Sequence, residues 1–286
     1  DIENATKMIT IGYDGKAAFS IKAVESGTFN LQFYADSSME EIENEGVMYD
    51  ISNFLAGEWN AKKIYSYGCF VKEDGSSIGL GVLSRFPLSD VKVHSIDVRT
   101  EKSVQPSSRP VLEVTVVKDN KPVALFVNHW KSKSGSAEES ECWRNWQENV
   151  LAKRCIECEQ NGVCFAAAGD FNRNINEFSV DKYSGTVCLG NRNVSAARNI
   201  CSQKSIEVTT PWYDNGELLE PGSYFFNDGW ERIDHIFVSR TAKVILFRTE
   251  TDGAWCDSET KKPFGFTLWS GAGYSDHLPV TAVIRY

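Results

Sequence analysis

Two short apolar runs in the middle of the chain have the length and composition of buried β-strands. They cover residues 123–127 and 164–168, and polar residues follow each run directly. A looser apolar stretch ends at residues 264–269, and we expect it to form a third strand of this kind. Because strands without alternating polar positions are buried on both faces, the pattern favours an α/β or α+β fold.

The rest of the pattern predicts one long helix and several further strands. Residues 137–160 predict the helix, since their apolar positions recur at helical spacing. Those positions are Trp143, Trp146, Val150, Leu151 and Ile156. Further strands are expected at residues 78–83, 109–114, 233–239, 243–249 and 280–284. The long polar stretch 174–222 is interpreted as a loop that is functional or held by additional structure.

The N-terminal part predicts a separate hairpin and a helix. Residues 7–24 read as two strands around a turn at residues 13–16, so we expect residues 1–24 to be an N-terminal extension hairpin. Ser38 followed by Glu41 has the capping-box pattern that starts a helix. The sequence has no internal repeat or linker of biased composition, and residues 1–286 are therefore predicted to form a single domain.

Composition limits the classes of protein that the chain can represent. Of its 286 residues, 42% are hydrophobic and 12% are aromatic, which is enough for a substantial core. No apolar run approaches the roughly 18 residues of a membrane span. The net charge is −9, and acidic residues are concentrated between Glu25 and Glu58. A long basic groove for nucleic acid is not expected, although a divalent cation could supply local positive charge.

Four short segments offer side chains that bind metal ions or phosphate. They are residues 128–133 (Asn-His-Trp-Lys-Ser-Lys), 169–172 (Gly-Asp-Phe-Asn), 232–235 (Arg-Ile-Asp-His) and 275–279 (Ser-Asp-His-Leu-Pro). Three of the four follow a predicted buried strand, and a polar side chain at such a strand end is held rigidly while it faces a cleft. Hard oxygen ligands with few histidines favour Mg²⁺ or Mn²⁺ over zinc.

In this order, the four segments resemble those of the endonuclease/exonuclease/phosphatase superfamily, the deoxyribonuclease I-like, metal-dependent phosphoesterases. The resemblance extends from about Thr28 to the C-terminus, and residues 78–87 resemble the family's strand that ends in Ser-Arg-x-Pro. It implies an α/β fold built as a four-layer α/β/β/α sandwich, with two mixed β-sheets face to face and helices outside. It also implies phosphoester hydrolysis by water without a covalent intermediate.

The resemblance and the chemistry of the side chains give the motif residues their expected roles. His277 is the expected general base, and Asp234 would hold its other ring nitrogen. Asp276 would hold the metal ion directly or through water. Asp170 would orient the attacking water or assist the leaving group.

Other motif residues are expected to contact the substrate. His129, as a cation, and the amide of Asn172 would each contact a phosphoryl oxygen. Four more residues are candidates for substrate binding at the rim of the cleft, namely Trp130, Lys131, Lys133 and Arg85. Trp130 could stack on a base or pack against a lipid, and either lysine could bind a second phosphate. These three residues of the 128–133 segment are equally compatible with ordinary surface positions.

The metal-binding glutamate is the main departure from the family pattern. Members carry Gln-Glu at the end of the second strand, and this chain has no such pair in that region. Glu58 lies at about the family's distance from Asn30, so we expect Glu58 and Asn30 to complete the metal site. If Glu58 is not the ligand, the site lacks its principal metal carboxylate, and the chain is weakly active or a binding module.

The leading functional hypothesis is a Mg²⁺-dependent (or Mn²⁺-dependent) phosphoester hydrolase that uses a water nucleophile. A nuclease that cleaves DNA phosphodiesters is the first choice. The alternative is a phosphomonoesterase or lipid phosphodiesterase of the inositol-phosphate or sphingomyelin type. A further alternative is a non-catalytic binding module that lost its metal glutamate. The expected partner is a phosphoester substrate, with DNA among the candidates, and the chain is expected to be a monomer.

The cysteines and the start of the chain bear on its location. Eight cysteines and a beginning at Asp1 without methionine favour an extracellular or periplasmic protein, and a removed leader stays open. Cys188 and Cys201 flank a polar loop and are the expected disulfide pair.

Overall fold

The computed structural model describes residues 65, 67–73, 78–95, 109–134, 137–192, 204–267, 269–270 and 272–286 of the chain. All of these residues belong to one compact unit, Glu45–Tyr286. The predicted N-terminal hairpin, the helix expected from Ser38, and the candidate metal residues Asn30 and Glu58 lie outside the described residues.

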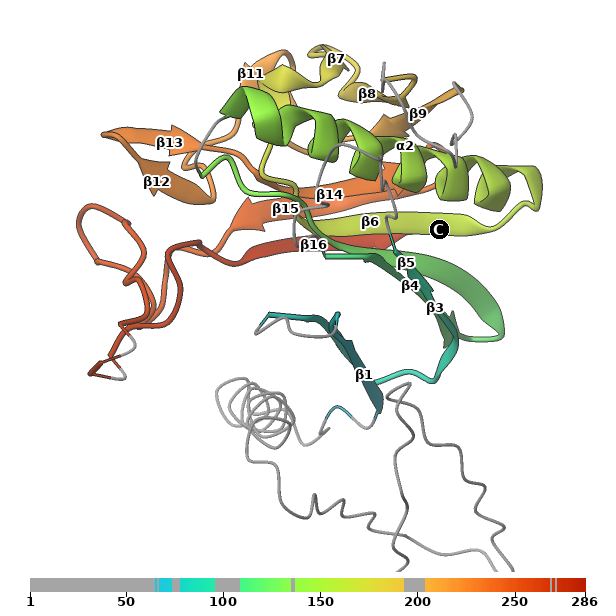
Figure 1. Ribbon diagram of the computed structural model, residues 1–286, viewed down its shortest axis with the longest axis horizontal. Coiled ribbons are helices and arrows are strands. Elements are labelled where there is room, and N and C mark those ends of the chain that lie inside the picture. The colour runs from blue at the N-terminus through green and yellow to red at the C-terminus, as the bar shows by residue number, and fades with distance from the viewer. Residues whose placement is uncertain are drawn as a thin grey trace, which may run out of the picture. The chain divides into compact units, whose positions relative to one another are not determined.

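An eight-stranded mixed sheet is the largest element of the described part (Figure 1). Its strands lie in the order β3–β4–β5–β6–β14–β9–β8–β7. Their bounds are β3 Leu88–His94, β4 Val111–Lys118, β5 Lys121–His129, β6 Cys164–Asp170, β7 Ser179–Asp181, β8 Thr186–Gly190, β9 Ser205–Thr209 and β14 Asp234–Ser239. β5 and β6 are parallel, whereas the other neighbours in this sheet are antiparallel. A parallel pair requires a long crossover connection, and here that connection is a helix.

This helix, α2 (Ala137–Gln160), covers one face of the sheet (Figure 1). The main core lies between them and includes Phe126, Leu151, Phe165, Val187, Val208 and Phe237. Each such side chain contributes roughly 1.5–3 kcal/mol to stability through its burial. The helix is the one that the sequence predicts, and Trp146 and Leu151 are buried as expected.

Two antiparallel strand pairs lie on the opposite face of the sheet. They are β1 Tyr67–Val71 with β2 Leu80–Ser84, and β15 Lys243–Thr249 with β16 Val280–Arg285. Leu80 and Val82 pack against Leu112 and Val114 of the large sheet. β15 and β16 pack in the same way against β14, at Ile236 and Val238. The predicted α/β class with two facing sheet layers is therefore confirmed, and among the described residues helix α2 is the outer layer on one side.

The stretch 174–222 is held by additional structure, which is one of the two alternatives that its polar composition left open, and it is not one continuous loop. It contains the short 3-10 helix η1 Ile175–Glu177, the strands β7, β8 and β9, and the pair β10 Tyr213–Asp214 and β11 Glu217–Leu218. Val187, Leu189, Ile206 and Val208 alternate with more exposed neighbours and are buried. The strands are only three to five residues long, so this alternation of period two is too brief to stand out in a polar sequence.

Residues 264–269 do not form the expected buried strand. Phe264 and Phe266 are about half exposed, and Trp269 is 96% exposed. The backbone instead folds back on itself, with Thr267 bridged to Ala272 and the Tyr274 N–H donating to the Phe264 carbonyl at 2.7 Å. The side chains of Phe264, Phe266 and Trp269 thus face solvent. An apolar run in the sequence does not by itself show whether its side chains are buried or exposed.

Several smaller expectations can be compared directly with the structure. The strands predicted at residues 78–83, 109–114, 233–239, 243–249 and 280–284 are present as β2, β4, β14, β15 and β16, with ends shifted by a few residues. Cys188 has a free thiol, against the predicted disulfide with Cys201, which lies outside the described residues. In the part of the chain that the structure describes, no helix has the length and apolarity to cross a membrane.

Candidate active site

Three neighbouring strands bring three of the candidate side chains to one edge of the sheet. His129 ends β5 and Asp170 ends β6, and the two residues are partners in the parallel register. Asp234 begins β14 and is the antiparallel partner of Asp170. Since hydrogen-bonded strands lie roughly 4.8 Å apart, Asp170 sits between His129 and Asp234 at interaction distance.

His277 reaches the same edge from the C-terminal segment. Its backbone forms a bridge with Tyr224, and the N–H of the next residue, Leu278, donates to the Ser223 carbonyl at 2.7 Å. The Ser223 hydroxyl accepts a hydrogen bond from the Asp234 N–H at 3.3 Å. Ser223 thus ties the two segments together, and His277 Nδ1 lies 2.7 Å from Asp234 Oδ2.

Gly169 allows β5 and β6 to come close together just before these residues. Its φ is +132°, and a Cβ atom there would lie 1.9 Å from the carbonyl oxygen of Asn128. Only glycine adopts this backbone conformation readily and also avoids the contact. Beyond it, the Trp130 N–H donates to the Asp170 carbonyl at 2.8 Å, so the pairing continues past the strand ends.

Asn172 holds the carboxylate of Asp170 rather than facing a phosphoryl oxygen. Its backbone N–H donates to Asp170 Oδ1 at 2.7 Å. Its side-chain Nδ2 donates to Asp170 Oδ2 at 2.8 Å and to the Trp130 carbonyl at 3.1 Å. Both hydrogens of the amide group are therefore engaged, which corrects the expected donation from Asn172 to the substrate.

A pocket of about 700 Å³ opens over this edge of the sheet. Its walls include the candidate residues His129, Lys133, Asp170, Asn172, Asp234, Asp276 and His277, together with Arg109, Tyr224 and Phe226. Residues far apart in the sequence thus meet around one cavity, as the motif pattern predicts. A concave site with converging ionisable groups is the usual form of an active site.

Arg109 is a pocket residue for which sequence reasoning gave no role. It lies two residues before β4, the neighbour of β5, and burial lowers the pKa of its guanidinium while the charge of Asp170 raises it. Its Nε is buried, and within the described residues it has no hydrogen-bond partner. The available signal was its place at the start of the predicted strand 109–114, whose antiparallel neighbour ends in a motif histidine.

The ionisable groups in the pocket shift one another's pKa values. Burial, aided by Asp234, raises the pKa of Asp170 to about 6. Burial opposes protonation of His277, but the hydrogen bond and negative charge of Asp234 prevail and raise its pKa to about 9. Burial and the charges of Arg109 and His277 lower the pKa of His129 to about 4. In the protein without metal or substrate this shift favours the neutral imidazole of His129, whereas the sequence predicted a cation.

Two residues of the 128–133 segment are held away from the pocket. Trp130 is fully buried and packs against Phe171 and Phe178, and its indole N–H donates to Asn128 Oδ1 at 3.1 Å. The expected contact of Trp130 with substrate is thus corrected, because the side chain belongs to the core. Lys131 is fixed through its backbone and is not among the residues that line the pocket.

The other two candidates for substrate binding differ from each other. Lys133 lines the pocket, but its Nζ donates to Glu177 Oε2 at 2.6 Å, so its charge is largely balanced. Arg85 is exposed, lies over the ring of Tyr65 at 5.1 Å, and is not part of the pocket wall. The expectation that Arg85 contacts substrate in this pocket is therefore corrected.

One exposed carboxylate at the pocket has the chemistry of a cation ligand. Asp276 is exposed and lines the cavity near Asp170 and the two imidazoles. Among the described residues, no cluster of three or more His, Cys, Asp or Glu is arranged to hold a metal ion. Mg²⁺ needs only one or two carboxylates because it keeps several waters, so Asp276 fits this cation as a hard oxygen ligand.

Fold and pocket together define a two-sheet α/β protein whose carboxylates and imidazoles gather at strand ends. The sequence matches the Endonuclease/Exonuclease/phosphatase family over residues 35–285, and the chain belongs to this family. Membership assigns it to the phosphoester hydrolases, which as a family generally use divalent metals. No curated protein matches the sequence of this chain.

Solved structures are similar at low sequence identity. Humanized D. rerio TDP2 with 14 mutations has a TM-score of 0.51 and 13% identity, over 88% of this chain and 94% of that chain. An endonuclease/exonuclease/phosphatase family protein from Leptotrichia buccalis has a TM-score of 0.47 and 15% identity, over 91% of this chain and 84% of that chain. The similarity to the D. rerio TDP2 structure supports the fold of this chain and nothing beyond the fold.

Proposed function

We propose that this protein is a Mg²⁺-dependent phosphodiesterase that hydrolyses nucleic acid, DNA first, with a water nucleophile. The observation that carries the proposal is the His277–Asp234 pair, 2.7 Å apart, in a pocket that also holds Asp170 and Asp276. An imidazole that is oriented by a carboxylate and faces a cavity is suited to take a proton from water.

His277 is the general base of this proposal. Without a metal its pKa is raised to about 9, so the imidazole starts protonated near neutral pH. It must lose that proton before it can accept one from water. A divalent cation bound beside Asp276 would favour the neutral imidazole of His277 and would make the attacking water easier to deprotonate. Asp234 then stabilises the imidazolium that forms as the water is deprotonated.

Arg109 and His129 are the proposed contacts to the phosphoryl oxygens. Arg109 brings a fixed positive charge to the pocket, and its Nε lacks a partner among the described residues. His129 is neutral near pH 7 and has one ring N–H to donate. A charged donor and a neutral donor that converge on one cavity stabilise the negative charge that develops on phosphoryl oxygens.

Asp276 is the proposed metal ligand in the described part, with Glu58 and Asn30 as predicted ligands beyond it. The variant Glu58→Gln tests this set, because an amide keeps the shape of the side chain and loses the charge. We expect Mg²⁺-dependent hydrolysis to fall by about 10²-fold or more. Glu43→Gln, in the same acidic region, is the matched control and should retain activity. Equal activity of the two variants would remove Glu58 from the metal site.

Two aromatic rings favour a nucleic acid substrate. The Tyr224 ring lies 4.6 Å from the His277 ring, and Phe226 stacks on Tyr224 at 5.9 Å. Both line the pocket, and Phe226 is 49% exposed. Bases next to a scissile phosphate can stack on such rings without sequence preference, at roughly 1–3 kcal/mol per base.

A lipid phosphodiester is the second candidate, and a different observation favours it. Phe264, Phe266, Trp269 and Tyr274 are all exposed in the segment that immediately precedes Asp276 and His277. Aromatic side chains of this kind are suited to the interface between water and lipid. A lipid headgroup would then reach the pocket from a membrane surface.

A panel of phosphoester substrates distinguishes these proposals. Plasmid DNA, single-stranded DNA, abasic DNA, an inositol phosphate and sphingomyelin vesicles are assayed with Mg²⁺, Mn²⁺ and EDTA. We expect hydrolysis of DNA that EDTA abolishes. Hydrolysis of sphingomyelin alone would replace the nuclease with the lipid phosphodiesterase. Inactivity toward the whole panel would favour a binding module that lost its metal glutamate.

A further inference from the structure

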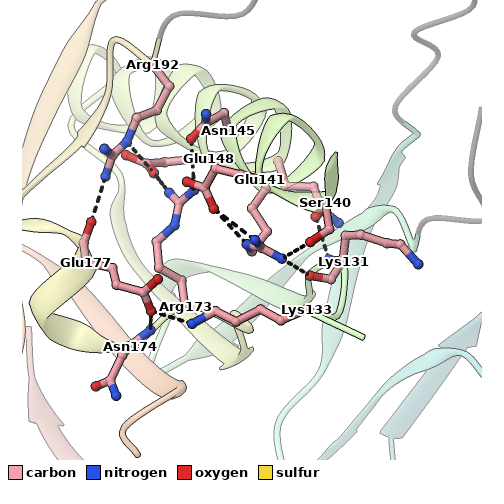
Figure 2. A network of polar contacts seen from close by, with 12 residues as sticks. Lys131, Lys133, Ser140, Glu141, Asn145, Glu148, Arg173, Asn174, Glu177 and Arg192 are labelled. Carbon is pink, nitrogen blue, oxygen red and sulfur yellow. Dashed lines mark hydrogen bonds and ion pairs between the residues drawn. The ribbon is translucent and has the colours of Figure 1, made fainter. Parts of the chain in front are cut away.

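The face of α2 that meets the active-site strand ends is polar, although it is buried. Ser140, Arg144, Gln147, Glu148 and Asn149 are all buried there. Figure 2 shows side chains of this helix converging on Arg173 and on the segment around Lys131. These two segments directly follow β6 and β5, which end in Asp170 and His129.

The segment after β5 is held by two residues of α2. Gln147 Oε1 accepts a hydrogen bond from the Lys131 N–H at 2.8 Å. Arg144 Nη1 donates to the Lys131 carbonyl at 3.0 Å. Both backbone groups of Lys131, two residues after His129, are therefore bonded to the helix.

The segment after β6 is held through the side chain of Arg173, which is only 1% exposed. Its guanidinium donates to the carboxylates of Glu148 and Glu141 and, at 2.8 Å, to Asn145 Oδ1 (Figure 2). All three acceptors belong to α2. Arg173 thus anchors the residue after Asn172 to the same helix.

The backbone of Arg173 is fixed from the opposite side by His235. The Nε2–H of His235 donates to the Arg173 carbonyl at 2.8 Å. His235 is fully buried and packs against Phe171, Phe178 and Phe237. Because burial lowers its pKa to about 4, the ring stays neutral and serves as a fixed hydrogen-bond donor.

Glu148 extends the connection beyond the active-site turn. It is fully buried, and its Oε1 accepts from the Gly190 N–H at 2.9 Å, at the end of β8. Its Oε2 accepts from Arg173 and, at 2.8 Å, from Arg192 Nε. One carboxylate therefore ties α2 to the turn after β6 and to the segment after β8.

A buried ion pair of this kind is a poor source of stability. The desolvation of two charges offsets most of their attraction, and apolar side chains of similar volume often serve equally well. The turn that Arg173 anchors is strained, because Asn172 has a φ of +46°. Strained backbone persists only where its surroundings fix it. We therefore expect the Arg173–Glu148 pair to fix the geometry of this turn and to add little to the free energy of unfolding.

We propose that Arg173 and Glu148 are positioning residues, which hold Asp170 and Asn172 in the geometry that the reaction requires. The kinetic test of this proposal rests on the proposed function. Within that function the two residues hold other groups in place, and neither of them touches the substrate. The test variant is the double replacement Arg173→Met and Glu148→Leu, which keeps the volume and removes both charges.

The expected result is a loss in kcat without a matching loss of stability. A misplacement near 1 Å costs about 10²-fold in rate, so we expect kcat to fall by about that factor with KM within about threefold. The matched control is Arg154→Met with Glu113→Leu, because Arg154 also joins α2 to a buried glutamate but contacts no residue of the pocket wall. The control should keep wild-type kcat when assayed while folded.

Two outcomes would overturn the proposal. One is a double variant whose kcat stays within about twofold of wild type, and the other is a kcat that falls only with the folded fraction. If the apolar pair does not fold, Arg173→Lys keeps the buried charge and loses the forked geometry. It should fold and lose at least about tenfold in kcat, and wild-type kcat in that variant would also contradict the proposal.

A second readout is independent of activity. The Asn172 N–H bonds to Asp170 Oδ1, so its hydrogen exchange reports on the turn itself. In the double variant we expect this exchange to speed up by about tenfold or more, with no change at Leu125 in the middle of β5. If the wild type hydrolyses no phosphoester, the proposed function fails while this exchange measurement still decides the positioning role. Unchanged exchange at Asn172 would rule it out.

Discussion

Asp170 is the residue on which the pocket depends. It lies between His129 and Asp234 across three strands, and both of its oxygens accept hydrogen bonds from Asn172. Burial and the neighbouring Asp234 raise its pKa to about 6, whereas His277 and Arg109 oppose this shift. Its protonation is thus poised near neutral pH, and any change in the surrounding charges alters it.

The pKa of His277 should fall when its carboxylate partner is neutralised. In Asp234→Asn the negative charge that favours the imidazolium is lost and the hydrogen bond to a carboxylate becomes at most one to a neutral amide, while burial, which disfavours the imidazolium, remains. We expect the pKa in the metal-free protein to drop from about 9 to about 6.5 or lower. Titration of the imidazole by NMR measures this value directly. A pKa still near 9 would mean that Asp234 is not its cause.

Replacement of Arg109 should weaken hydrolysis more than replacement of any exposed arginine. Arg109→Ala removes the fixed charge at the pocket wall, and we expect kcat/KM to fall by about 10²-fold. Arg85→Ala is the control, because Arg85 is exposed and lies outside the pocket wall. Steady-state kinetics on the best substrate compares the two. Equal losses in both variants would contradict the proposed phosphoryl contact of Arg109.

The sequence predicts most of the ionisable residues of the site, and it misses Arg109. His129, Asp170, Asp234, Asp276 and His277 occur in short motifs at strand ends, and all line one pocket. Trp130 lies in one of the same motifs but belongs to the core, since nothing in a local pattern reveals which face of a strand end is covered. Arg109 and Ser223 have no motif, and only the three-dimensional contacts identify them.

At the scale of elements, the site depends on the unit formed by β5, α2 and β6. The parallel pair places His129 beside Asp170, and the helix between them holds the segments that follow both strands. Gly169 permits the close approach of the strands, with the Asn128 carbonyl where a Cβ atom would lie. Crossover, glycine and motif residues therefore act as one structural unit.

Gly169→Ala should destabilise this unit severely. The φ of +132° disfavours any side chain, and the new Cβ would lie 1.9 Å from a backbone oxygen. We expect the free energy of unfolding to fall by more than about 3 kcal/mol. Gly162→Ala is the control, because Gly162 also has a positive φ but no atom within 4 Å of the added Cβ. Gly162→Ala should lower the free energy of unfolding by about 1 kcal/mol. Urea unfolding measures the loss in both variants.

Equal losses in the two glycine variants would contradict this explanation. The steric contact at Gly169 would then contribute nothing beyond the backbone conformation.

Long apolar runs and helical periodicity predict the elements of the large sheet well, and short or exposed elements poorly. The strands β5 and β6 and the helix α2 lie where the sequence places them. The strands β7 to β9 were missed, because each offers only a few alternating positions. Residues 264–269 were misread for the opposite reason, since their apolar side chains face solvent rather than a core.

At the scale of the molecule, stability should depend on pH through Glu113, which joins β3, β4 and α2. Burial would raise its pKa, but hydrogen bonds from His94, Arg154 and Lys92 hold the pKa well below its usual range. A depressed pKa stabilises the fold above the pH at which an unfolded glutamate ionises. That contribution is lost as the pH falls through the folded value.

We therefore expect Glu113→Gln to reduce the free energy of unfolding at pH 7 and to have less effect below about pH 4. Urea unfolding of both proteins between pH 7 and pH 3 measures the difference. A difference that stays constant over this range would show that ionisation of Glu113 is not the cause.

The chain has a net charge of −9, and its acidic residues are concentrated between Glu25 and Glu58. Neither feature identifies the substrate. The family assignment is compatible with an acidic protein that acts on phosphoesters, because a divalent cation would supply the local positive charge. Glu58 and Asn30 stay predictions from the sequence, since the contacts that would place them lie outside the described residues.

The central claim is that His277 acts as the base of a metal-dependent phosphoester hydrolysis in this pocket. The most direct test is the rate of Mg²⁺-dependent hydrolysis of the best phosphodiester substrate by His277→Ala beside the wild type, with folding checked by circular dichroism. We predict a loss of about 10³-fold or more in a folded variant. A folded His277→Ala protein with the wild-type rate would contradict the account.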